Sequence, residues 1–266
     1  MKLSASAAWD ATADFLRRHG GLVFTVALAF FALPQILVTP FTGNMQAMTG
    51  DLQQAQAQAL RASPILLLVL LASVLGSLVI YTLVLRPGAS VGEAIGHGFR
   101  RLLPAVGVAA LFLLAGLLIT IPFTLLSFGS VQTGNPLLSL LALLLVPIAI
   151  YLFIRVFAAQ IAVADGRPPI DAIRRSWALT RGNVGRIFLL FLLVGVVGFI
   201  ILLAVNFVLG SLLLLLGNAL GGPTTGPFLV AILSALVSAL ITAVVLVLLA
   251  QVYRLLSGPE HAATPA

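Results

Sequence analysis

The side chains able to perform acid–base or metal chemistry are few and scattered along this chain. There are seven acidic residues, three histidines and no cysteine in 266 residues. The carboxylates are Asp10, Asp14, Asp51, Glu93, Asp165, Asp171 and Glu260. None of them lies in a long apolar run, so the sequence offers neither paired carboxylates in a membrane nor a cluster of metal ligands. We therefore expect no enzymatic activity, no cofactor and no metal site.

A basic stretch in the second half of the chain offers a different chemistry, the binding of phosphate groups. It reads RRSWALTRGNVGRIF, from Arg174 to Phe188, and directly precedes a long apolar run. On a helix, Ile170, Ile173 and Trp177 form an apolar stripe that arginines flank. Because the aromatic residue lies on that stripe, the stretch lacks the basic and aromatic platform typical of nucleic-acid binding. It matches a helix in the membrane interface, where each arginine gains about 1 kcal/mol from anionic lipid.

Two similar segments occur earlier in the chain, and candidate headgroup contacts come from all three. We name them the elbow segments: Ser4–Arg18, Ser90–Leu103 and Pro169–Arg181. Each is expected to form an amphipathic cytoplasmic helix that ends at a helix breaker, which is Gly20, Pro104 or Gly182. The candidates for contact with lipid headgroups are Arg174, Arg175, Trp177, Arg181, Arg100, Arg101, Arg17 and Arg18. The expected partners are therefore anionic membrane lipids, and no nucleic acid is expected.

Three polar residues stand inside or at the end of apolar runs, where an unpaired polar group is costly. Arg155 follows the fourth run and can extend toward the headgroups, as an anchor or as part of a substrate site. Gln35 follows Pro34, and Asn206 lies in the fifth run. Either residue can pair with a neighbouring helix or line a polar path, and the sequence leaves both alternatives open.

The composition decides which elements must position these residues. Apolar residues make up 61% of the chain, charged residues 8%, and the mean hydropathy is +1.19. Soluble domains average roughly 45–50% apolar and about 25% charged residues. The apolar runs approach or exceed the roughly 20 residues of a spanning helix and lack the alternation of a membrane barrel. The sequence therefore predicts an all-α polytopic membrane protein.

Six runs are long enough to span a bilayer, and the charge between them predicts their orientation. The predicted spans are Gly21–Val38, Ile65–Leu85, Val106–Leu126, Leu138–Val156, Ile187–Leu209 and Phe228–Val252, with Ser211–Leu216 as an interfacial piece. Of the 14 Lys and Arg residues, all except Arg61 fall in the tails, in the second and fourth loops, or at the span ends beside them. By the positive-inside rule, both termini are expected in the cytoplasm.

The runs and elbow segments suggest one membrane domain built from three similar units. Residues 1–256 are expected to form that domain, with repeat-like units at about 4–86, 90–158 and 169–255 and a short tail at 257–266. Each unit would be an elbow helix followed by a transmembrane hairpin. The sixth run also carries an alanine ridge: Ala231, Ala235, Ala239 and Ala243. Small residues at this spacing predict close helix packing within a bundle or in a homo-oligomer.

The stretches DAIRRSWALTRGNVGRIFLLFLL and SVGEAIGHGFRRLLPAVG, together with six spans, resemble a known family. They are similar to the membrane domain that precedes the catalytic barrel in some bacterial glycerophosphoryl diester phosphodiesterases, and to related free-standing six-span proteins. The resemblance implies a bacterial inner-membrane protein. It does not imply phosphodiesterase activity, because the soluble barrel that carries the metal ligands has no counterpart in this sequence.

These observations lead to two functional hypotheses. The first is a non-enzymatic inner-membrane protein that acts as a scaffold or accessory factor for envelope lipid processes, binding anionic lipid and a protein partner through its elbow helices. The alternative is a passive transporter of lipid or small molecules, which requires a cavity near Asn206, Gln35 or Arg155. Proton coupling is not expected, because the predicted spans contain no carboxylate.

Overall fold

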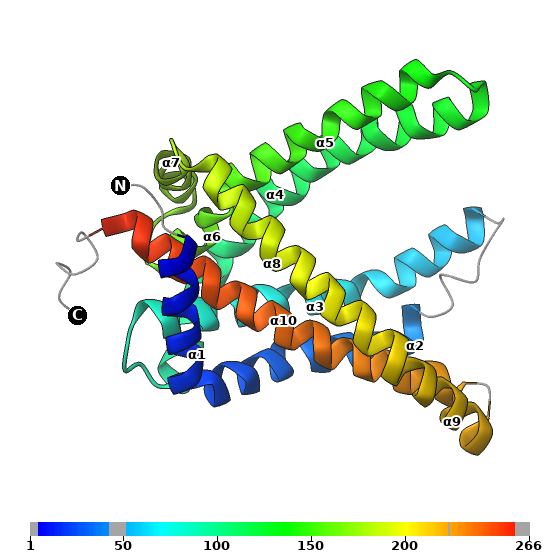
Figure 1. Ribbon diagram of the computed structural model, residues 1–266, viewed down its shortest axis with the longest axis horizontal. Coiled ribbons are helices and arrows are strands. Elements are labelled where there is room, and N and C mark those ends of the chain that lie inside the picture. The colour runs from blue at the N-terminus through cyan, green and yellow to red at the C-terminus, as the bar shows by residue number, and fades with distance from the viewer. Residues whose placement is uncertain (1–4, 43–51, 223, 259–266) are drawn as a thin grey trace.

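The computed structural model describes residues 5–42, 52–222 and 224–258, and this part of the chain is helical without strands (Figure 1). Six helical segments in it are long and apolar enough to cross a membrane. They are Ser6–Thr39, Ser63–Leu85, Val91–Thr133, Pro136–Ala164, Val184–Gly221 and Thr225–Ser257. The predicted all-α, six-span fold class is therefore confirmed. Residues 259–266 of the predicted tail lie outside the described residues.

The first two spans pack together around a glycine. The first comprises α1 (Ala5–Ala27), the π-helical turn η1 (Leu28–Ala32) and α2 (Leu33–Thr42), and the second belongs to α3 (Leu52–Leu85). The wider turn lies just before Pro34, which has no N–H to donate to the carbonyl of Phe30. A Cβ at Gly76 of α3 would lie only 2.5 Å from Cβ of Phe30, so the two helices cross at this glycine.

The third and fourth spans lie side by side as α4 (Val91–Thr133) and α5 (Pro136–Val156) (Figure 1). A capping box at Ser90 and Glu93 begins α4. The connection is short: Gly134 ends α4 in the left-handed conformation, with φ at 66°, and the Asn135 side chain caps α5. The loop predicted between the spans is mostly helical, because α4 continues to Thr133.

A short buried helix follows, where the sequence analysis expected a cytoplasmic loop. This helix, α6 (Ala158–Ala164), is separated from α5 by Phe157 alone. Six of its residues are buried: Ala158, Ala159, Ile161, Ala162, Val163 and Ala164. The small side chains allow α3, α4 and α10 to pack around α6. The chain then turns at Gly166, with φ at 103°, into α7 (Pro169–Thr180).

The last two spans form a second long pair. The fifth comprises α8 (Val184–Val205), the π-helical turn η3 (Asn206–Gly210) and α9 (Ser211–Gly221), and the sixth is α10 (Thr225–Ser257). The predicted interfacial piece Ser211–Leu216 is therefore part of a continuous helical segment. A Cβ at Gly217 would lie 2.5 Å from Cα of Gly226, so α9 and α10 cross at two glycines.

The predicted breakers end only one of the three elbow segments. Gly182, with φ at 81°, separates α7 from α8, as expected. Helix α1 continues through Gly20 and α4 continues through Pro104, so the predicted breaks at these residues are wrong. Figure 1 shows that α1 nevertheless changes direction between its first and last turns. A bend keeps most backbone hydrogen bonds, which is cheaper beside a membrane than a break.

The densest packing lies at one end of the bundle, and large apolar side chains cover the rest. Buried residues concentrate in α6, the second halves of α3 and α10, and the first half of α4. Three alanines of the α10 ridge, Ala235, Ala239 and Ala243, are buried within the chain itself. Elsewhere residues such as Leu118 and Phe207 are exposed, at 70% and 82%. An exposed apolar belt of this kind fits contact with lipid acyl chains.

Candidate functional site

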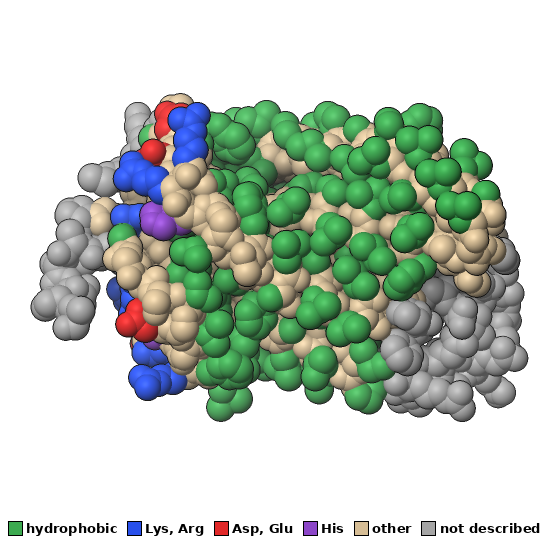
Figure 2. All heavy atoms as spheres, turned by 90° about the horizontal axis from the view of Figure 1, so that it is seen from below, with side chains coloured by type: hydrophobic (Ala, Val, Ile, Leu, Met, Phe, Trp, Pro, Cys, Tyr) green, Lys and Arg blue, Asp and Glu red, His purple; other side chains and the backbone are tan. Residues whose placement is uncertain are grey.

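Charged side chains gather at one end of the molecule, next to the apolar belt (Figure 2). Among the predicted headgroup contacts, Arg17, Arg18, Arg100, Arg174 and Arg181 are exposed, whereas Arg101 and Arg175 are partly buried. Two aromatic residues of the elbow segments, Trp9 and Trp177, are exposed by 48% and 42%. Arginine and half-exposed tryptophan together are typical of the boundary between lipid headgroups and acyl chains.

Arg155 and Trp177, which the sequence suggested as site residues, contact each other at the charged end of the molecule. The guanidinium of Arg155 lies 5.1 Å from the ring centre of Tyr151 and 5.0 Å from that of Trp177. Its Nε and Nη2 donate hydrogen bonds to the Tyr151 hydroxyl, at 3.0 and 2.8 Å, and Nη1 donates to the Trp177 carbonyl at 3.2 Å. The cation is thus held between two aromatic rings. Within the described residues, no carboxylate forms an ion pair with it.

Helix α7 is fixed to the end of α5 by contacts that the sequence analysis missed. The Ser176 hydroxyl donates to the Arg155 carbonyl at 2.8 Å, and Ser176 and Thr180 are both buried. These hydroxyls satisfy carbonyls near helix ends, where backbone acceptors lack partners. The only sequence signal for the contact was the placement of two hydroxyl residues on the face of α7 opposite Arg174 and Arg181.

An apolar groove of about 670 Å³ begins beside this cluster and runs between α4, α5 and α8. Near the cluster of Arg155, Tyr151 and Trp177, the groove is lined by Val156, Ile173 and Phe153. Its wall on α4 includes Phe112 and Gly116. Arg155 and Trp177 lie within one helical turn of Val156 and Ile173, respectively. One end of the groove is therefore lined by close neighbours in sequence of Arg155 and Trp177.

Other polar contacts connect α6 to its neighbours. His97 of α4 forms a hydrogen bond of 2.9 Å to the Ala164 carbonyl, and the Tyr253 hydroxyl of α10 donates to Asp165 at 3.1 Å. A Cβ at Gly166 would lie 3.3 Å from Nη2 of Arg101, so this arginine lies over the turn after α6. These contacts give His97, Arg101 and Asp165 structural roles at the charged end.

Residues 88–92 read GASVG and match the spacing of a serine-hydrolase nucleophile, a match that the sequence analysis missed. The serine of this motif, Ser90, caps α4: its hydroxyl accepts a hydrogen bond of 3.2 Å from the Glu93 backbone. The motif follows the helix α3 and a turn, whereas the hydrolase motif requires a strand before the serine. His97, the nearest candidate base along the chain, is bonded to Ala164. The geometry thus gives Ser90 a capping role.

The two remaining intramembrane candidates are not brought together. The Asn206 amide donates to the Leu202 carbonyl at 2.9 Å and accepts a hydrogen bond from the Ser234 hydroxyl of α10. Gln35 is exposed on α2 beside the buried Pro34. Asn206 therefore links two helices, while Gln35 faces outward. Among the residues that the structure describes, no group of three or more His, Asp or Glu side chains is placed to bind a metal.

Comparison with known families matches the chain to a family model. Neither the curated proteins nor the solved structures contain a match to this chain. The family model is described as "Domain of unknown function (DUF7847)", and it matches residues 5–256, which include all six candidate spans almost completely. This six-span chain, with its charged end and apolar belt, therefore belongs to the DUF7847 family.

Proposed function

We propose that this protein is a non-enzymatic scaffold or accessory factor that binds anionic lipid in a bacterial inner membrane. The exposed arginines beside the apolar belt support this proposal, because they lie where phosphate groups of a bilayer would lie. The positive-inside rule then assigns the charged end and both termini to the cytoplasm. A protein partner or a second copy of the chain would bind the exposed surface of the elbow helices.

A single observation carries the proposal: a fixed cation lies beside the end of an apolar groove. The groove can hold an acyl chain, because its walls are aliphatic and aromatic side chains. Arg155 is held in place by Tyr151 and Trp177, so binding a phosphate there costs little side-chain entropy. Four of its N–H groups donate to protein acceptors, which leaves the fifth for a lipid oxygen.

Native mass spectrometry of the full chain, released from nanodiscs of phosphatidylcholine and phosphatidylglycerol, tests this proposal. We expect the wild type to retain phosphatidylglycerol preferentially. Arg155→Gln should lower that retention about fivefold, as loss of a contact of about 1 kcal/mol implies. The control Arg86→Gln removes an exposed charge outside the groove and should change retention little. Equal retention of both lipids by the wild type, or an unchanged Arg155→Gln variant, contradicts the proposal.

A passive lipid transporter is the second candidate, and the position of the groove favours it. The groove lies between helices whose outer surfaces carry exposed apolar residues, so a lipid can enter it from the bilayer. Transfer between leaflets would be measured with fluorescent phospholipid in liposomes, using dithionite to quench the outer leaflet. Faster transfer with the protein than in empty liposomes supports transport. Equal rates exclude it and leave lipid binding as the function.

A further inference from the structure

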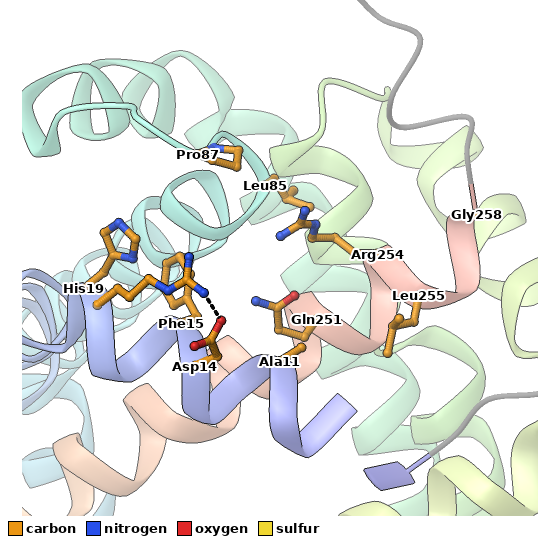
Figure 3. Close-up of a pocket in the computed structure, with 11 residues that line it drawn as sticks. Ala11, Asp14, Phe15, His19, Leu85, Pro87, Gln251, Arg254, Leu255 and Gly258 are labelled. Atoms are coloured by element: carbon orange, nitrogen blue, oxygen red, sulfur yellow. Dashed lines mark hydrogen bonds and ion pairs between the residues drawn. The ribbon is translucent and has the colours of Figure 1, made fainter. Parts of the chain in front are cut away.

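A second cavity lies at the charged end, away from the groove beside Arg155. It has a volume of about 610 Å³ and is formed by the middle turns of α1, the end of α3 and the last turns of α10 (Figure 3). Its polar lining consists of Asp14, Arg18, His19, Gln251 and Arg254. The cavity thus combines residues from both ends of the chain, and its size is that of a small-molecule site, for which about 300–1,000 Å³ is usual.

Gln251 is the buried polar group of this cavity. The residue is only 5% exposed, and its side-chain amide lines the cavity without a hydrogen bond to any other described residue. Figure 3 shows the amide rising from α10 toward the space below Leu85 and Pro87. Side-chain amides of residues as little exposed as Gln251 are usually paired with protein or with ordered water, so this amide has hydrogen-bonding capacity left for a molecule in the cavity. An amide in this position therefore points to a ligand with hydrogen-bonding atoms.

The charges around Gln251 favour an anion. Asp14 is paired with Arg18 one turn along α1, so the two charges balance each other. On the opposite wall, Nη1 of Arg254 makes a long hydrogen bond, 3.4 Å, to the Val84 carbonyl, and within the described residues it has no carboxylate partner. The ring of His19 stacks on Phe15, with 4.8 Å between ring centres, at the edge of the same space. The guanidinium, the amide and the imidazole thus supply donors from two helices.

We propose that this cavity binds an organic phosphate, either a soluble phosphate ester or the headgroup of a phospholipid. A phosphate has three or more acceptor oxygens in a tetrahedral arrangement, so it can accept hydrogen bonds from donors on α1 and α10 at the same time. Leu85, Pro87 and Leu255 provide apolar surface for the organic part. This inference goes beyond the proposed lipid groove, because the two sites share no residue.

Calorimetric titration tests the soluble source, with the full chain in phosphatidylcholine nanodiscs and inorganic phosphate or glycerol phosphate as probes. Gln251→Leu should weaken binding about tenfold, since an amide contact to a charged group is lost, and Gln251→Glu should abolish it by repulsion. Both variants should fold, because leucine removes a buried polar group and glutamate keeps the shape; unchanged helical circular dichroism verifies this. The matched control is Arg186→Gln, which removes an exposed charge from the first turn of α8, outside the cavity.

A lipid source gives a different pattern in the same proteins. Soluble probes then bind weakly, but nanodiscs doped with phosphatidylglycerol yield one retained lipid that Gln251→Leu loses and Arg155→Gln keeps. If only Arg155→Gln loses the retained lipid, the result supports lipid binding in the groove and not in the cavity. The groove proposal and the cavity proposal can therefore fail separately. If Gln251→Leu and Gln251→Glu match the wild type in both assays, the cavity is not a phosphate site.

Discussion

Asn206, a polar side chain within the fifth apolar span, connects two helices. It bonds to its own helix and to Ser234 on α10, in agreement with the structural role that the sequence favoured over a polar path. In a bilayer such a pair contributes little, because the separated groups find other partners in the unfolded helices. The pair therefore fixes the register of two spans rather than supplying much stability.

This role can be measured with a double-mutant cycle of Asn206→Leu and Ser234→Ala. We expect a coupling energy of about 0.6 kcal/mol, and at most about 1.7 kcal/mol, in unfolding by sodium dodecyl sulfate in mixed micelles. Ser238→Ala, one turn farther along α10, provides the matched control in place of Ser234→Ala. If the effects of Asn206→Leu and Ser234→Ala are strictly additive, the hydrogen bond has no energetic significance.

The sequence predicted which residues belong to the candidate site, but not which of them contact one another. The arginines and Trp177 were identified because charge beside an apolar run is visible in one segment. The contact between Arg155 and Trp177 was not, since it depends on α6, whose Ala-rich sequence reads equally well as a span end or a loop. Gln251 had a visible signal, a glutamine within the last apolar run. That Gln251 lines a cavity could not be predicted, because Asp14 and Arg18 of the same cavity lie more than 230 residues away in the sequence.

At the scale of elements, close helix crossings depend on a few glycines. Periodicity and run length predicted the six spans well, because a bilayer allows few alternatives to continuous helices. The same constraint explains why α1 and α4 continue through Gly20 and Pro104, where a rule derived from soluble proteins predicted breaks. The positions of the crossings were not predictable, since small residues occur in every span.

The crossing of α3 and η1 gives a prediction for Gly76. Gly76→Ala should lower the free energy of unfolding by about 1–3 kcal/mol, because its Cβ would lie 2.5 Å from Cβ of Phe30 and the helices must separate. Thermal unfolding in detergent, followed by circular dichroism, measures the change. Gly107→Ala is the matched control: its Cβ meets no atom within 4 Å, so a neutral or slightly positive effect is expected. A Gly76→Ala variant as stable as this control would contradict the crossing.

On the face of the molecule shown in Figure 2, the charged side chains of the described residues lie at one end, and apolar side chains cover much of the rest. Asp165 contacts the last turns of α10, whereas Thr225 begins that helix. A helix of 33 residues is about 50 Å long, which exceeds the bilayer core of about 30 Å. The two positions must therefore lie on opposite sides of a membrane that the protein spans.

Orientation follows from this separation and from the arginines. A reporter inserted at Asp165 should be active as a cytoplasmic fusion, and one inserted at Thr225 as a periplasmic fusion. Paired alkaline phosphatase and green fluorescent protein fusions at each position measure this. Periplasmic activity at Asp165 contradicts the orientation, and the same compartment for both positions contradicts the six-span arrangement itself.

The central claim is that a membrane lipid occupies the groove beside Arg155. Photocrosslinking tests it most directly, with a phosphatidylglycerol that carries a diazirine in its acyl chain. The wild type should be labelled mainly on peptides containing Phe112, Phe153 and Phe191. Gly116→Leu should fill the groove and remove that labelling, whereas Gly107→Leu, outside the groove on the same helix, should not. Labelling spread evenly over the apolar belt, or unchanged in Gly116→Leu, would show that the groove holds no specific lipid.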